Sequence, residues 1–189
     1  MKMNLLKTIP DLIKSPKKTW LFIKAESYST KNIIKNFLFP IIIAASILKL
    51  LGRFINLHDF SIINTTLSFF AFIFISFSVI LISGLIINEL LPKFKLEKNL
   101  NLVIKLISFS SFPAIIANGL SSLHPHFSFL NIISLYTIIL FWTGAIQCLQ
   151  IPKEHTTGFV LISLIIVATS LFIISFTTMT VFLSIFFNL

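Results

Sequence analysis

Residues 159–186 read FVLISLIIVATSLFIISFTTMTVFLSIF, a stretch without a single charged side chain. A helix of about 20 apolar residues crosses a hydrocarbon core about 30 Å thick, so this stretch is long enough for one crossing. The residues from Leu161 to Val167 do not alternate between polar and apolar, as the strands of membrane barrels do. Since only helices and closed barrels satisfy their backbone groups in lipid, the stretch predicts a transmembrane helix.

Four more apolar stretches precede this one, at residues 37–56, 62–87, 102–123 and 129–150. Each of them is long enough to cross the bilayer as a helix. The composition agrees, because only 11% of the 189 residues are charged, against about 25% in soluble domains. The mean hydropathy is +0.99. We therefore predict an all-α membrane protein in which residues 37–189 form a domain of five transmembrane helices.

The N-terminal region, residues 1–36, is basic and predicts a helix of a different kind. Ser15 and Pro16 are typical of the residue before a helix and of its first position. A helix starting there would place these residues on one face: Trp20, Ile23, Ser27, Thr30 and Ile34. Most lysines of the region lie on the other faces. We therefore predict a basic amphipathic helix at the membrane surface, the alternative being a solvated tail.

The lysines are unevenly distributed along the chain, whose net charge is +9. They gather before the first stretch and in the second and fourth connections, whereas the first and third connections contain neither Lys nor Arg. Cytoplasmic loops of membrane proteins are enriched in Lys and Arg, so the pattern places the N-terminus in the cytoplasm and the C-terminus outside. This segregation indicates membrane topology rather than nucleic-acid binding. The many Ile, Lys, Phe and Asn residues favour a low-GC bacterium, and hence its inner membrane.

Two cations, Lys49 and Arg53, lie four residues apart near the outer end of the first stretch. They would share one face of a helix and could bind an anionic lipid headgroup or substrate. In the alternative, both side chains reach toward water from the end of the span, with Arg53 paired to Asp59. We favour this alternative, because cations near span ends are commonly tolerated in this way.

A second group of polar residues is expected at the cytoplasmic end of the spans. Glu89 would pair with Lys93 if the second helix continues that far. Lys105 opens the third span from the same side. The full group is Glu89, Lys93, Lys105, Gln147, Gln150, Lys153 and Glu154. We favour a hydrated interface over a dedicated cluster here, because charges at span ends need no special partner.

Small residues recur along two of the spans. In the third span they are Ser110, Ala114, Ala117 and Ser121, with Asn118 beside them as an amide deep in the span. In the fifth span Ser163, Ser170, Thr177 and Ser184 recur every seven residues. Small residues let membrane helices approach closely, so both sets predict packing seams rather than a conduit. Pro113 lies inside the third span and should kink it.

The sequence predicts no catalytic residue, no cofactor site and no metal site. It contains no G-x-G-x-x-G, P-loop, H-E-x-x-H or G-x-S-x-G motif, and serines lack credible His and Asp partners. His124 and His126 supply only two imidazoles, too few for a dedicated metal site. Cys148 is the single cysteine and lies in an apolar stretch, where a thiolate is disfavoured. We therefore expect a protein that is not an enzyme.

Several short motifs follow one another along the chain. They are Ser15-Pro16-Lys17-Lys18-Thr19-Trp20, Phe39-Pro40, Phe112-Pro113-Ala114, His124-Pro125, Leu135-Tyr136 with Gly144, and Ile151-Pro152-Lys153-Glu154-His155-Thr156. In this order, over roughly residues 10–180, the chain resembles the YIP family (the Ypt/Rab-interacting type of membrane domain) in its bacterial branch. The resemblance implies five membrane helices and a cytoplasmic N-terminal region. It implies Rab-type GTPase partners for the eukaryotic members alone, and it offers no catalytic residues.

These observations lead to one functional hypothesis and two alternatives. The first is a non-enzymatic scaffold or membrane-organising protein of the YIP type, which binds protein partners, itself among them, and anionic headgroups at the cytoplasmic face. The alternative is a small transporter or permease-type subunit, with a polar path through Lys49, Arg53, Asn118 and Glu89. A third and weaker hypothesis is a metal-handling protein that uses His124 and His126.

Overall fold

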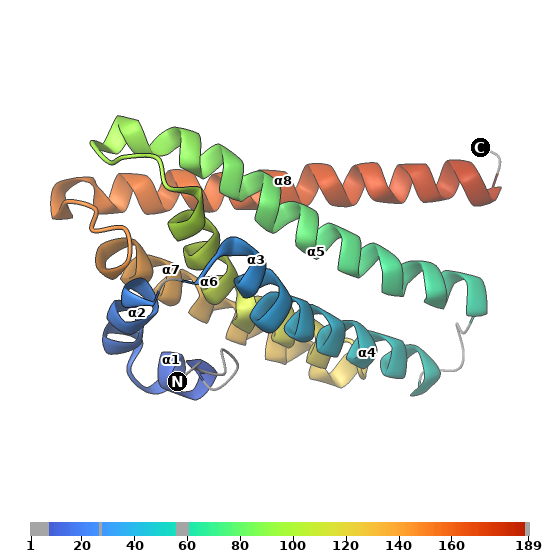
Figure 1. Cartoon of the computed structure of the whole chain (residues 1–189). Coiled ribbons are helices and arrows are strands. Elements are labelled where there is room, and N and C mark those ends of the chain that lie inside the picture. The colour runs from blue at the N-terminus through green and yellow to red at the C-terminus, as the bar shows by residue number, and fades with distance from the viewer. Residues whose placement is uncertain (1–7, 27, 56–60, 188–189) are drawn as a thin grey trace.

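The computed structural model describes residues 8–26, 28–55 and 61–187. These residues form helices joined by short connections, and no strand occurs among them (Figure 1). The elements are α1 (Thr8–Lys14), α2 (Pro16–Ala25), α3 (Thr30–Ile33), the π-helical turn η2 (Ile34–Leu38), α4 (Phe39–Ile55), α5 (Ile62–Leu90), the 3₁₀ helix η4 (Leu91–Phe94), α6 (Leu100–Ser121), the 3₁₀ helix η5 (Pro125–Leu135), α7 (Tyr136–Gln147) and α8 (Lys153–Phe187).

Five helical stretches of the described chain are long and apolar enough to span a membrane. They are Thr30–Ile55, Ile62–Phe94, Leu100–Ser121, Pro125–Gln147 and Lys153–Phe182. The predicted all-α class and the five membrane-spanning helices are therefore confirmed at this level. Four of the five stretches begin earlier than the apolar runs, and polar and charged residues such as Lys31 and Lys35 extend the first of them.

Helix α6 lies at the centre of the bundle. It packs against α4, α5, α7 and η5, and its residues from Val103 to Ser110 are all buried. Helix α8 packs mainly against α5 and runs beside it at the edge of the molecule (Figure 1). Phe172 and Phe176 on α8 are 72% and 66% exposed, as expected of side chains that face lipid. Helix α8, one of the two most hydrophobic spans, thus lies at the edge, and α6, the least hydrophobic of the five, forms the core.

Helices α4 and α6 approach closely at two glycines. A Cβ on Gly119 would lie 2.9 Å from Cα of Ala45. A Cβ on Gly52 would lie 1.9 Å from the carbonyl oxygen of Ser122. Neither glycine was predicted to be a packing position. The signal that was available is an isolated glycine within a helical pattern, which often has a packing reason.

The small residues predicted to form packing seams in α6 and α8 differ in how deeply they are buried. Ser110 and Ala117 are buried in α6, while Ala114 and Ser121 are half-buried. In α8, Ser163 and Ser170 are buried but Thr177 and Ser184 are exposed, so only the first half of that repeat lies against other helices. Pro113 is buried inside α6, which continues through it as one α-helix.

The N-terminal region forms several short helices instead of the one predicted. Helix α2 begins at Pro16 with Ser15 as its N-cap, as expected. It ends at Ala25, because Glu26 has an extended backbone with ψ of 127°. A new helix, α3, starts at Thr30 after Ser29, whose side chain accepts a hydrogen bond from Asn32 N. The single face from Trp20 to Ile34 was therefore wrong, and Ser27 lies outside the described residues.

The fourth span also differs from the prediction of residues 129–150. Its first half is the 3₁₀ helix η5, which starts at Pro125, and only its second half, α7, is α-helical. Helix α7 ends at Gln147, and Gln150 adopts a left-handed backbone with φ of 58° shortly before Pro152. The apolar residues after Gln147 therefore turn back into the core, where Cys148, Leu149 and Ile151 are buried.

Candidate functional site

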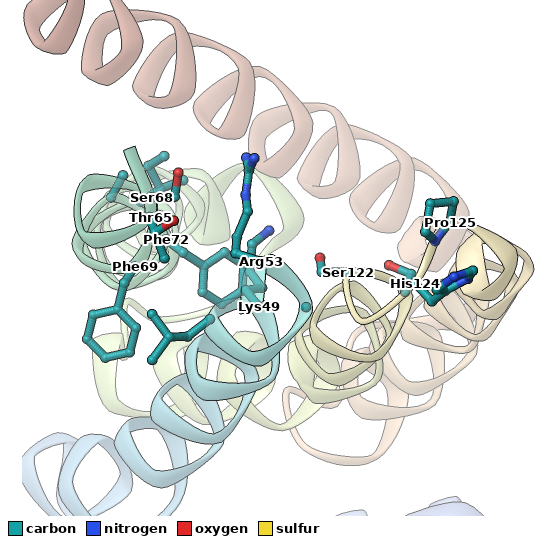
Figure 2. Close-up of a pocket in the computed structure, with 14 residues that line it drawn as sticks. Lys49, Arg53, Thr65, Ser68, Phe69, Phe72, Ser122, His124 and Pro125 are labelled. Carbon is teal, nitrogen blue, oxygen red and sulfur yellow. The ribbon is translucent and has the colours of Figure 1, made fainter. Parts of the chain in front are cut away.

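A cavity of about 560 Å³ opens at the end of the bundle far from α1 and α2. Lys49 and Arg53 project into it from the last turns of α4. They lie between side chains of α5 on one side and the segment after α6 on the other (Figure 2). The polar and aromatic residues that line the cavity around these two cations are Thr65, Ser68, Phe69, Phe72, Ser121, Ser122 and His124. The i, i+4 spacing read from the sequence thus brings both cations to one site.

Lys49 is held by two neighbouring helices. Its Nζ donates a hydrogen bond of 2.8 Å to Oδ1 of Asn118 on α6. The same Nζ lies 4.6 Å from the centre of the Phe72 ring on α5, at cation–π distance. Asn118 was predicted to lie deep in its span, and that was wrong. It is exposed, because α6 ends three residues later, at Ser121.

Arg53 is exposed and forms no hydrogen bond or salt bridge with any residue of the described ranges. Its predicted partner, Asp59, lies outside those ranges. None of the described residues that line the cavity is a carboxylate. The site therefore combines two cations of like charge with hydroxyl groups and aromatic rings, an arrangement suited to an anion.

A second cavity, of about 450 Å³, adjoins the first. The two share Arg53, Ser68, Ala71 and Ile75. The second cavity lies between α5 and α8, with Leu67, Met179 and Phe182 among its apolar lining residues. The cationic site is thus continuous with a more apolar space along the outer helices.

The polar residues at the opposite end of the bundle do not gather into one cluster. Glu89 forms a salt bridge with Lys98, not with Lys93 as predicted. The reason is local: α5 gives way to η4 at Leu91, and Lys95 adopts a left-handed backbone with φ of 60°, so the chain turns back. Five members of the predicted group are exposed at the surface, namely Glu89, Lys93, Gln150, Lys153 and Glu154.

Lys105, also predicted for that group, is instead a buried connection to α2. Only 2% of the residue is exposed. Its Nζ donates hydrogen bonds of 2.6 Å to the carbonyl oxygen of Glu26 and 3.5 Å to that of Ile23. Both carbonyls lie at the C-terminal end of α2, and that of Glu26 accepts a second hydrogen bond from Tyr28 N at 2.9 Å. A cation is also favoured at this end of a helix, so Lys105 fixes the C-terminus of α2 on the bundle.

Further contacts hold the N-terminal helices against α6 and α7. The Trp20 side chain is fully buried, and its ring centre lies 6.2 Å from that of Phe109. It packs so closely on α7 that a Cβ on Gly144 would come within 2.7 Å of two ring atoms. The Tyr136 hydroxyl donates to the carbonyl oxygens of Leu12 and Ile13 in α1, at 3.2 and 3.1 Å. Helices α1 and α2 are therefore part of the packed protein.

Charged and apolar side chains are both exposed on the outward face of α2 and at the end of α1, which precedes it. Lys14, Lys17 and Lys18 are exposed, and so are Leu21 and Phe22, at 52% and 45%. Trp20 and Ile23, which were predicted to face the membrane, are instead buried against the bundle. The apolar side chains that face outward are therefore different residues from those predicted.

The two histidines lie together at the rim of the first cavity. Their ring centres are 4.8 Å apart, and His126 N donates to Nδ1 of His124 at 3.3 Å. Within the described chain, no group of three or more His, Cys, Asp or Glu side chains could hold a metal ion.

Comparisons of the chain with protein-family models, curated proteins and solved structures found no match. The resemblance to the YIP family therefore stays a prediction.

Proposed function

We propose that this protein is a non-enzymatic organiser of the bacterial inner membrane, with its N-terminus in the cytoplasm and its C-terminus outside. Its basic N-terminal helices bind anionic lipid headgroups, and its bundle binds partner proteins, further copies of the chain among them. The observation that carries this proposal is the docking of α2 with lysines and apolar side chains left outward.

The docked helix suits the boundary between lipid and water. Exposed lysines near an anionic surface contribute about 1 kcal/mol each, and neighbouring apolar side chains such as Leu21 and Phe22 insert among the headgroups. Because Lys105 and Tyr136 fix the backbone of α1 and α2, binding requires little further ordering of these helices. The orientation rests on the positive-inside rule applied to the lysine-rich segments.

The alternative of a small transporter has less support. Lys49 and Arg53 lie at one end of the bundle, whereas Glu89 pairs with Lys98 at the other. Between these ends the described part of α6 is buried among apolar side chains, as at Phe109. A polar path would have to cross this region, so we favour the organiser.

The test places an environment-sensitive fluorophore on the outward face of α2 in the full-length protein. Leu21→Cys is labelled in a Cys148→Ser background and reconstituted into nanodiscs with or without phosphatidylglycerol. We expect the label to report a more apolar environment in the anionic discs, and salt to reverse this shift. The Lys14→Gln/Lys17→Gln/Lys18→Gln variant should lose the shift.

The matched control removes the same charge elsewhere on the lysine-rich side, as Lys93→Gln/Lys95→Gln/Lys153→Gln. All of these lysines are exposed, so neither variant should disturb the fold. An unchanged label environment in anionic and neutral discs would count against the proposal. So would an equal loss of the shift in the control variant.

A further inference from the structure

The cationic cavity leaves most of its hydrogen-bond donors available to a ligand. A lysine ammonium has three donors, and Lys49 uses one of them on Asn118. The Arg53 guanidinium has five donors, and no described residue accepts from it. A guanidinium matches two oxygens of a phosphate at once. The two cations therefore present a convergent set of donors with no described carboxylate among the lining residues.

The surrounding groups favour an anion over a neutral ligand. The cavity reaches the first turn of α5 at Thr65, where the helix dipole attracts negative charge. The Ser122 hydroxyl donates to the carbonyl oxygen of Asn118, so it is occupied within the protein. His124 accepts from His126 N at Nδ1, which leaves the hydrogen of the neutral ring on Nε2, a further donor at the rim.

The neighbouring cavity decides between a soluble anion and a lipid. It continues from Arg53 and Ser68 along the seam between α5 and α8, past Leu67 and Phe182. Both helices lie at the edge of the bundle (Figure 1), and both belong to spans that are long and apolar enough to cross a membrane. This extension is lined by apolar side chains together with Asn64, Ser175 and Thr178. A phosphate ion gains nothing from its apolar part, whereas a phospholipid needs both a charged and an apolar part of its site.

From these observations we propose that the two cavities together bind one anionic phospholipid. The phosphate lies between Lys49 and Arg53, and an acyl chain occupies the space between α5 and α8. This site is at the opposite end of the bundle from the N-terminal lysines, in the outer leaflet if the proposed orientation holds. It is therefore separate from the lipid-binding face of α2.

The test measures lipid binding to the purified full-length protein in detergent by native mass spectrometry. Phosphatidylglycerol is compared with phosphatidylcholine of the same acyl chains, and inorganic phosphate serves as the soluble competitor. The variants are Arg53→Gln, Lys49→Gln/Arg53→Gln, and Ala71→Leu, which fills the space shared by the two cavities. The matched control, Lys93→Gln/Lys153→Gln, removes two exposed cations at the other end.

We expect a preference for phosphatidylglycerol that falls about fivefold in Arg53→Gln and about thirtyfold in the double variant. The control should keep the preference. Ala71→Leu should weaken lipid binding while the thermal unfolding temperature stays unchanged, and inorganic phosphate should compete poorly. Since the Arg53 guanidinium has no hydrogen-bond or salt-bridge partner among the described residues, its variant separates binding from folding.

Two outcomes overturn the proposal. In the first, the double variant binds phosphatidylglycerol as tightly as the unchanged protein, and the cations then hold no lipid. In the second, inorganic phosphate competes fully and Ala71→Leu has no effect, so the site takes a soluble anion. Neither outcome bears on the labelled α2 experiment, because the variants lie at opposite ends of the bundle.

Discussion

Replacing Gly144 by alanine should displace Trp20 and with it helix α2. The added Cβ would lie 2.4 Å from Cδ1 of Leu106 and 2.7 Å from two ring atoms of Trp20. The leucine methyl can move, but the indole ring is rigid and fully buried. Its ring also stands edge-on to Phe109, with an interplanar angle of 81°, so rotation in place is blocked. The steric clash with Trp20 is therefore relieved only if α2 moves away from α7.

The size of the effect follows from two opposing terms. Overpacking a well-packed core by one methyl group costs typically about 1–3 kcal/mol. Replacing glycine within a helix by alanine returns up to about 1 kcal/mol, because the unfolded chain loses freedom. We therefore expect a net destabilisation of about 0–2 kcal/mol together with a local displacement of α2. Gly158→Ala is the control, since the atom nearest its added Cβ is 3.9 Å away, so only the favourable term applies.

The assay follows Trp20 itself. The chain has two tryptophans, so Trp142→Phe leaves Trp20 as the single fluorophore. In that background, acrylamide quenching of Trp20 should be weak, and it should increase in Gly144→Ala but not in Gly158→Ala. Thermal unfolding of both variants in the same detergent gives the stability change. Equal quenching in the two variants, with Gly144→Ala as stable as Gly158→Ala, would refute the close packing of α2 on α7.

Three further predictions concern contacts that hold the bundle together. Lys105→Met should lower the unfolding free energy by about 1–3 kcal/mol, measured by thermal unfolding, because the carbonyls that end α2 lose their buried donor. Tyr136→Phe removes one hydroxyl that serves α1, so we expect a loss of about 0.5–1.5 kcal/mol and faster proteolysis within α1. Gly52→Ala places a Cβ 1.9 Å from the Ser122 carbonyl oxygen, a backbone atom that cannot rotate away. It should destabilise more than Gly144→Ala in the same assay, and equal stability would contradict the close approach of α4 and α6.

The membrane-spanning architecture could be predicted because its signal is local. A crossing requires only that enough apolar residues follow one another, and the run from Phe159 onward contains no charge. The bounds were less accurate, since helix ends depend on capping and backbone geometry. The extended backbone at Glu26 divides the predicted N-terminal helix, and the left-handed residue Gln150 follows the end of α7.

The candidate site could be predicted only in part. Lys49 and Arg53 were correctly predicted to share one face of a helix, because residues four apart lie about one helical turn from each other. The groups around them come from α5 and from the segment after α6, and no periodicity links Thr65 or His124 to α4. Asn118 was predicted to lie too deep in the third span because α6 ends at Ser121, earlier than the predicted end of that span.

Lys105 shows how a buried cation can join two parts of one chain. Its place near the start of an apolar span suggested a hydrated position. A buried ammonium needs several acceptors, and the end of a helix offers carbonyl oxygens that are not used in hydrogen bonds within the helix. Helix α2 supplies such an end, and Trp20 and Ile23 of the same helix lie in one hydrophobic core with Phe109 of α6. The polar and apolar contacts therefore depend on each other: without the buried lysine the carbonyls that end α2 lose their side-chain donor, and without α2 the lysine lacks its acceptors.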